Sequence, residues 1–106
     1  MTAGTLAPGA TAHGAVPDLG QLWWTFPVTA GDDVNFTVTV PMGQVRFNVL
    51  RGGTCGTAVP VEVRFPTAPG DAWTNAAPAT ENFYVQVLHV HAQPDPTNFS
   101  FSYTLT

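Results

Sequence analysis

Positive charge is nearly absent from this sequence. It contains no lysine, and its only basic side chains besides histidine are Arg46, Arg51 and Arg64, against seven acidic residues. Nucleic-acid binding requires a basic face that neutralises phosphates, so a net charge of −4 argues against a nucleic-acid partner. Charged residues make up only 9% of the chain, and so weakly charged a surface suits permanent packing against a protein partner. The alternative is a neutral, threonine-rich extracellular domain.

Cysteine and long apolar runs are also scarce. Cys55 is the single cysteine, which excludes an internal disulfide and is interpreted as a loop thiol without a role. No segment approaches the roughly 18 apolar residues of a membrane span, so no membrane partner is expected. The first six residues lack the basic and apolar regions of a signal peptide. We therefore expect a chain made without export, or one from which a signal has been removed.

What the sequence does contain is a series of short segments in which apolar and polar residues alternate. Ten prolines and ten glycines separate them, and alternation of this kind is typical of half-buried strands. The segments are 22–28, 34–40, 45–49, 59–65, 83–87 and 99–105. The pattern predicts an all-β, antiparallel β-sandwich of jelly-roll or immunoglobulin-like type, with about seven to eight strands.

The boundaries of this domain are expected at residues 19 and 106. Residues 1–18 are small and polar and are predicted to form an extended N-terminal arm or an edge strand. Residues 66–80 are rich in proline, alanine and glycine and are predicted to form a long surface loop. The inward-facing positions predict a core made of Trp24, Phe26, Val34, Phe36, Val38, Phe47, Val49, Val85, Val87, Phe99, Phe101 and Tyr103.

Several segments match a known bacterial pattern. Residues 23–31, W-W-T-F-P-V-T-A-G, are similar to the D-W-Y-T-F-x-V-x-A-G opening of bacterial pre-peptidase C-terminal domains. Further similarities lie at 34–38, 50–56, 83–87 and 103–106. The resemblance covers about residues 19–106 and implies a jelly-roll-like sandwich of the kind appended to secreted enzymes, where some members bind collagen, polysaccharide or calcium. Gln21 and Leu22 stand where the family usually has an acidic residue, which argues against calcium.

Candidate chemistry is sparse. His89 and His91 are two residues apart on one strand, so both could face a metal ion with His13 as a third ligand. Zinc needs three or four ligands, and no further ligand is placed by the sequence, so structural histidines are the simpler interpretation. Cys55 has no helix N-terminus to lower its pKa, and no Gly-x-Ser-x-Gly motif is present. We expect no catalytic residues, no metal and no cofactor.

Aromatic residues outside the expected core are the best interaction candidates. Trp23 is expected on the strand face opposite to that of Trp24, and Trp73 lies in the expected loop. Trp23 and Trp73 could therefore contact a partner or stack on a sugar. The alternative is that the loop folds back over Trp23. Leu6 and Val16 are the sizeable apolar groups of the N-terminal segment and complete the candidate set. Arg46 and Arg51 are expected to pair with Glu62 on the next strand.

These observations favour a non-enzymatic structural or interaction module. The first hypothesis is a subunit that docks on a larger assembly, such as a capsid-decoration or tail-surface protein of a phage virion assembled in the host cytoplasm. Its partners would be capsid or tail subunits, or further copies of itself. The second hypothesis is a secreted accessory domain that binds carbohydrate or matrix protein.

Overall fold

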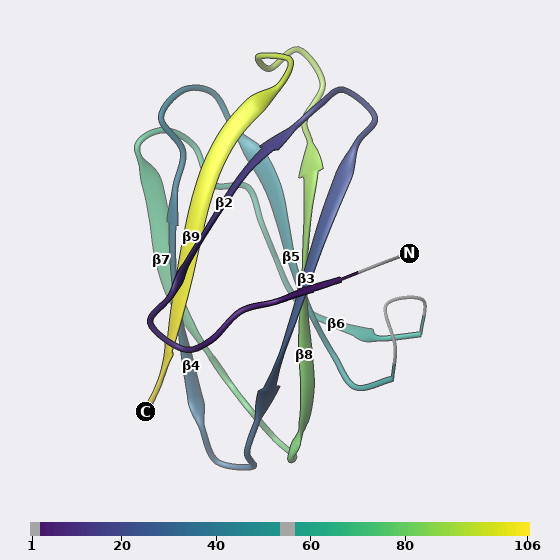
Figure 1. Ribbon diagram of the computed structural model, residues 1–106, viewed down its shortest axis with the longest axis vertical. Helices are drawn as coiled ribbons and strands as arrows, with labels where there is room; N and C mark the ends of the chain where they lie inside the picture. Colours follow the sequence, from purple (N-terminus) through teal and green to yellow (C-terminus); the bar gives the residue numbers. More distant parts are fainter. Residues whose placement is uncertain (1–2, 54–56) are drawn as a thin grey trace.

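Two β-sheets packed face to face make up the chain, as the ribbon in Figure 1 shows. A computed structural model describes residues 3–53 and 57–106. Within this part the strands are β1 (Gly4–Thr5), β2 (Thr11–Val16), β3 (Gln21–Val28), β4 (Asp33–Thr39), β5 (Val45–Arg51), β6 (Val59–Arg64), β7 (Gly70–Ala76), β8 (Glu81–His89) and β9 (Thr97–Leu105). The expected β-sandwich is confirmed, with nine strands in the described residues rather than seven or eight.

The two sheets divide the strands unequally. One sheet has five strands in the order β1-β3-β8-β5-β6, and the other has four in the order β2-β9-β4-β7. All pairings are antiparallel except that of β1 with β3. In the described ranges no helix is long and apolar enough to cross a membrane.

Aromatic side chains fill the space between the sheets. Phe26 of β3 stacks on Tyr103 of β9 with ring centroids 3.7 Å apart. All predicted core residues are buried except Trp24. Trp24 is partly buried and packs edge-on against Phe99 and Phe101, with centroids 5.8 and 5.1 Å away. The strict alternation of apolar residues in β4, β8 and β9 explains why the core could be predicted so closely.

The predicted surface loop at residues 66–80 is wrong. Residues 70–76 form β7, which pairs with β4 at the edge of the four-stranded sheet. Trp73 lies opposite Phe36 and stacks on it, with centroids 5.3 Å apart, and its exposed fraction is 8%. Small residues around Trp73 hide the alternation, because alanine and threonine, as at Ala72 and Thr74, are not diagnostic of either face.

The expected pairing of Arg46 with Glu62 requires Glu62 on the outer face of β6, but the structure places it inward. Phe47 and Val49, both in the core, lie opposite Arg64 and Glu62, so the two charged residues share the inner side. Val63 and Phe65 lie outside and are 44% and 51% exposed. A register shift between Val49 and Leu50 accounts for this placement, because one extra residue exchanges the two faces of a strand.

The inward charges of β6 find partners on β7 across the open side of the sandwich. The guanidinium of Arg64 lies 3.3 Å from the carboxylate of Asp71 and 4.9 Å from the centre of the Trp73 ring. The expected pairing of Arg46 and Arg51 with Glu62 does not occur. Arg51 pairs with Glu81 at 2.8 Å, because β5 lies next to β8 as well as β6.

The N-terminal segment contributes one edge strand to each sheet. β2 pairs with β9 and β1 with β3. Val16 is fully buried, Leu6 packs against the core, and the Tyr103 hydroxyl donates a hydrogen bond to the Leu6 carbonyl. Burial raises the pKa of this phenol to about 12. Of the two forms expected for the N-terminal segment, the described residues 3–18 therefore show strands of the chain's own sheets.

Replacement of Phe36 by alanine should lower the free energy of unfolding by about 3–5 kcal/mol, because it opens a cavity beside Trp73 and Phe47. Thr37→Ala, at the exposed neighbouring position, should change it by less than about 0.5 kcal/mol. Urea denaturation monitored by tryptophan fluorescence measures both. Similar small losses for the two variants would contradict the assigned strand face.

Deletion of residues 2–17 should destabilise the domain severely, because it removes the buried Val16 and leaves β9 without its neighbour on one side. Circular dichroism against temperature is the measurement, with Thr11→Ala as a control that preserves the strand. A truncated chain that melts like the parent would show that the segment is an arm with no structural role.

Candidate functional site

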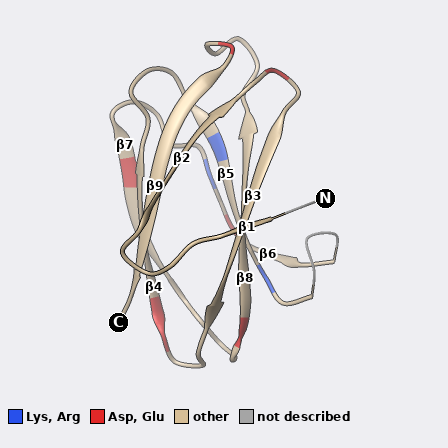
Figure 2. Ribbon diagram, viewed as in Figure 1, with Lys and Arg blue, Asp and Glu red and all other residues tan. Residues whose placement is uncertain are grey.

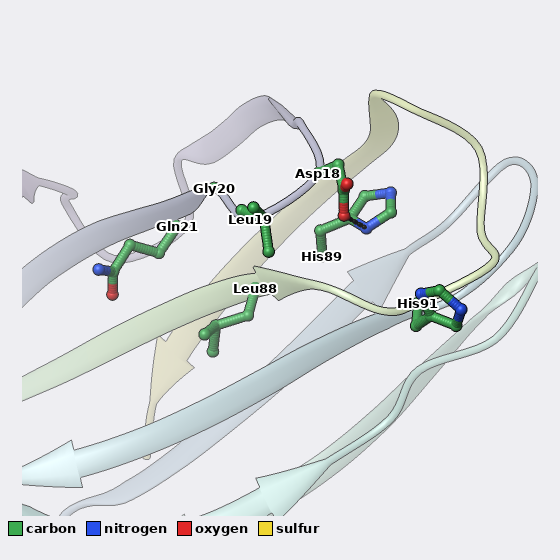
Figure 3. A pocket seen from close by; sticks show the side chains of 7 residues that line it. All are labelled: Asp18, Leu19, Gly20, Gln21, Leu88, His89 and His91. Carbon is green, nitrogen blue, oxygen red and sulfur yellow. Dashed lines mark ion pairs between the residues drawn. The ribbon is translucent and has the colours of Figure 1, made fainter.

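One pocket lies at the end of the sandwich where β2 turns into β3 and β8 ends (Figure 3). Its volume is about 340 Å³, at the lower end of the range of small-molecule sites. The residues that line it are Asp18, Leu19, Gly20, Gln21, Leu88, His89 and His91. Among these described residues there is no serine, threonine or cysteine, so the lining offers no hydroxyl or thiol nucleophile.

His89 connects the three chain segments around this pocket. Its side chain is only 3% exposed. Nε2 lies 2.8 Å from the carbonyl oxygen of Pro94, and Nδ1 lies 3.5 Å from a carboxylate oxygen of Asp18. The Asp18 amide in turn donates to the Asp95 carboxylate at 3.0 Å. Because a carbonyl can only accept, Nε2 must carry a proton, whereas Nδ1 has no hydrogen bond. The bond between the Asp18 amide and Asp95 joins the β2–β3 turn to the β8–β9 loop.

The three histidines do not converge on one metal ion. His91 lines the pocket but its ring lies apart from the pair formed by His89 and Asp18 (Figure 3). His13 lies on β2 opposite Ser100. Within residues 3–53 and 57–106, no group of three or more His, Cys, Asp or Glu side chains could hold a metal.

Leu19 is a feature that sequence reasoning missed. Its side chain is 97% exposed and its backbone φ is 60°, a left-handed conformation that non-glycine residues rarely adopt. The sequence Pro17-Asp18-Leu19-Gly20 indicates a turn, but it does not reveal that the leucine stands fully in solvent beside a pocket. Strain of this kind is often found at functional sites.

The four predicted interaction residues do not form one exposed surface. Trp23 lies on the outer side of the five-stranded sheet, but it is 9% exposed and packs with Leu50 and Tyr84. Trp73 and Val16 are buried in the core, and Leu6 packs against it. Neither Trp23 nor Trp73 presents an open ring face for stacking. Cys55 lies outside the described residues.

A chain of hydrogen bonds crosses the outer side of the five-stranded sheet. Asn48 accepts from Arg46 Nε at 3.2 Å and donates to Gln86 at 3.1 Å. The Oε1 atom of Gln21 accepts from Gln86 at 2.6 Å and from the Trp23 indole at 3.1 Å. The participating strands, β3, β8 and β5, are neighbours, so side chains far apart in the sequence form a single polar network.

A continuous surface joins this network to the pocket. Gln21 lies opposite Leu88, Leu88 lies opposite Arg46, and the Arg46 guanidinium lies over the Phe65 ring. We call this surface the apical face, and define it by Leu19, Gln21, Leu88, Arg46, Val63 and Phe65. Three of its members, Leu19, Val63 and Phe65, are apolar and exposed.

Charge is distributed unevenly over the fold (Figure 2). All three arginines lie on the neighbouring strands β5 and β6. Most acidic residues lie toward the strand ends and loops, as at Asp18, Asp33, Glu81 and Asp95, whereas Glu62 lies within β6. The β5–β6 side is therefore the only basic part of an acidic molecule.

Comparison with known proteins identifies the fold. No family model and no curated protein sequence matches the chain. Among solved structures, the periplasmic inhibitor of g-type lysozyme PliG from Aeromonas hydrophila superposes with a TM-score of 0.76, at 18% identity over 99% of this chain and 96% of that one. PliG from Salmonella Typhimurium gives 0.68, at 10% identity over 100% of both chains.

The sequence resemblance is confirmed at the level of fold. The pre-peptidase C-terminal domain of a Bacillus anthracis collagenase superposes with a TM-score of 0.57, at 13% identity over 99% of this chain and 95% of that domain. At identities this low the likenesses establish a shared small β-sandwich, and fold by itself does not determine function.

Replacement of His89 by alanine should destabilise the domain by about 1–3 kcal/mol, because it removes the bond to the Pro94 carbonyl and the contact with Asp18. The loss should be the same with and without a chelator, since it arises from protein contacts. The exposed His91 provides the control, and His91→Ala should leave the melting temperature unchanged. A chelator-dependent loss in the parent protein would indicate a metal site instead.

Proposed function

We propose that this chain is a non-catalytic protein-binding module that works outside the cytoplasm, and that a g-type lysozyme is its partner. The observation that supports it most directly is the apical face, where Leu19, Val63 and Phe65 are exposed at 97%, 44% and 51%. Exposed apolar side chains on one surface are typical of protein contact surfaces.

The described residues do not assemble a reaction centre at the pocket, and this supports a binding role. The pocket combines a histidine and a carboxylate but has no nucleophile among its described lining residues. The Asp18 amide and the His89 imidazole are each bonded to the β8–β9 loop. A site whose polar groups are used for positioning supports recognition better than catalysis.

The proposal of a g-type lysozyme as partner rests on the comparison with solved structures. Two lysozyme inhibitors superpose on essentially the whole chain, and both are periplasmic proteins. The periplasmic location of these two inhibitors supports the hypothesis of a secreted domain over that of a virion-surface protein, which the low charge favoured. Carbohydrate stacking receives less support, because Trp23 and Trp73 are only 9% and 8% exposed.

Biolayer interferometry with immobilised g-type lysozyme tests the proposal, together with the turbidity of a peptidoglycan suspension as a measure of lysis. We expect a dissociation constant in the micromolar range or tighter, and inhibition that follows occupancy. Leu19→Asn should weaken binding about tenfold, because asparagine tolerates the left-handed turn but removes the apolar contact. Thr37→Ser, on the outer side of the other sheet, is the control.

A folded chain that neither binds nor inhibits g-type lysozyme would contradict this partner. Co-sedimentation of the chain with purified phage particles would then support the virion-surface alternative. If Leu19→Asn leaves lysozyme binding unchanged, the proposed function stands, but the contact with lysozyme lies elsewhere on the molecule.

A further inference from the structure

Arg46 is the one arginine whose charge has no counter-ion in the described part of the chain. Arg51 is paired with Glu81 at 2.8 Å, and Arg64 lies 3.3 Å from Asp71. Arg46 has no ion pair with any described carboxylate, although the protein carries seven acidic residues. An unbalanced cation in an acidic molecule indicates where an external carboxylate would be attracted.

The guanidinium of Arg46 is held in a fixed orientation. Its Nε donates to Asn48 at 3.2 Å, and Asn48 is itself only 9% exposed and bonded to Gln86. The Nη1 and Nη2 groups have no hydrogen bond to any described residue. A guanidinium restrained through Nε and free at both terminal nitrogens is ready to form a bidentate bond with a carboxylate.

Apolar groups surround this cation. Its guanidinium carbon lies 5.9 Å from the centre of the Phe65 ring, and Leu88 lies opposite it on the neighbouring strand. Val63 is exposed on the same side of β6. A partner that covered Phe65 and Val63 would remove water from the ion pair and strengthen it.

The edge of β6 is poorly suited to pairing with another strand. Pro60 removes a backbone donor, the register shift interrupts the edge, and Glu62 and Arg64 point inward. Such features block edge-to-edge pairing in natural sheets. Contact at this corner must therefore be made by side chains on the face of the sheet.

We infer that Arg46, Phe65 and Val63 form a docking site for a protein that presents an aspartate or glutamate carboxylate within an apolar surface. The inference rests on the proposed function and specifies the chemistry of the surface that recognises the partner. The network from Asn48 to Trp23 acts on Arg46 as a positioning element, and the two exposed apolar side chains supply the surrounding contact.

NMR titration of the ¹⁵N-labelled 106-residue chain tests this inference without any natural partner. The probes are the peptides acetyl-Val-Glu-Leu-amide and acetyl-Val-Gln-Leu-amide. Because the protein has three arginines and no lysine, its side-chain Nε–Hε signals can be assigned by substitution. The Glu peptide should shift the Arg46 signal and the Val63 and Phe65 amides, and the Gln peptide should bind about fivefold more weakly.

Single substitutions test which residues bind the peptides. Arg46→Gln should remove the preference for the Glu peptide, and Phe65→Thr should weaken both peptides equally. Arg51→Gln is the matched control, because Arg51 lies on the same strand but is already paired with Glu81. Equal affinity for the two peptides, or no shift of the Arg46 signal at millimolar peptide, would overturn the inference. So would a shift that depends on protein concentration alone, which would identify a second copy as the occupant.

The two proposals can fail separately. If lysozyme binds the parent chain and Arg46→Gln with the same affinity, the docking site is wrong and the protein-binding function stands. If lysozyme does not bind but the Glu peptide selects Arg46, the docking site stands and the partner is another acidic protein. If lysozyme binds through this site, Arg46→Gln should weaken it about tenfold, and added salt should reduce the difference.

Discussion

Contact between aromatic rings of opposing sheets holds this sandwich together. Phe26 of β3 stacks on Tyr103 of β9, while Phe47 of β5 meets Trp73 and Phe101 of the other sheet, with centroids 5.2 and 5.3 Å away. The described ion pairs are few and mostly partly exposed, and such pairs contribute little to stability. Close packing of these rings therefore determines the separation and the register of the two sheets.

The outer surface follows directly from that inner packing. Because Phe47 and Val49 face the core, Arg46 and Asn48 must face out, and the same alternation on β8 turns Gln86 and Leu88 outward. The strands bring these side chains side by side, so the amide network needs no dedicated loop to position it. The members of the apical face that lie on strands, Gln21, Leu88, Arg46 and Val63, are thus part of the rigid sheet, and their positions are as well defined as the core.

Much of the fold could be predicted from the sequence because alternation in β4, β8 and β9 is unambiguous. Two errors have local causes. The small residues around Trp73 hide a strand, and one extra residue near Val61 turns Glu62 inward, away from its expected partner Arg46. The candidate site could not be predicted, because the contact between Gln21 and Gln86 joins residues 65 positions apart and depends on strand order. The exposure of Leu19 likewise depends on a backbone conformation that the sequence does not reveal.

The strand order also has a consequence for biosynthesis. β8 lies between β3 and β5, and β9 lies between β2 and β4, so the last two strands of the domain occupy interior places in the two sheets. A nascent chain cannot complete the five-stranded sheet until β8 has left the ribosome, or the four-stranded sheet until β9 has followed. Most contacts of the domain join distant parts of the chain, which is the condition for slow folding. The earlier apolar strands lack these partners until then, so protection from aggregation is needed at least until β9 is available.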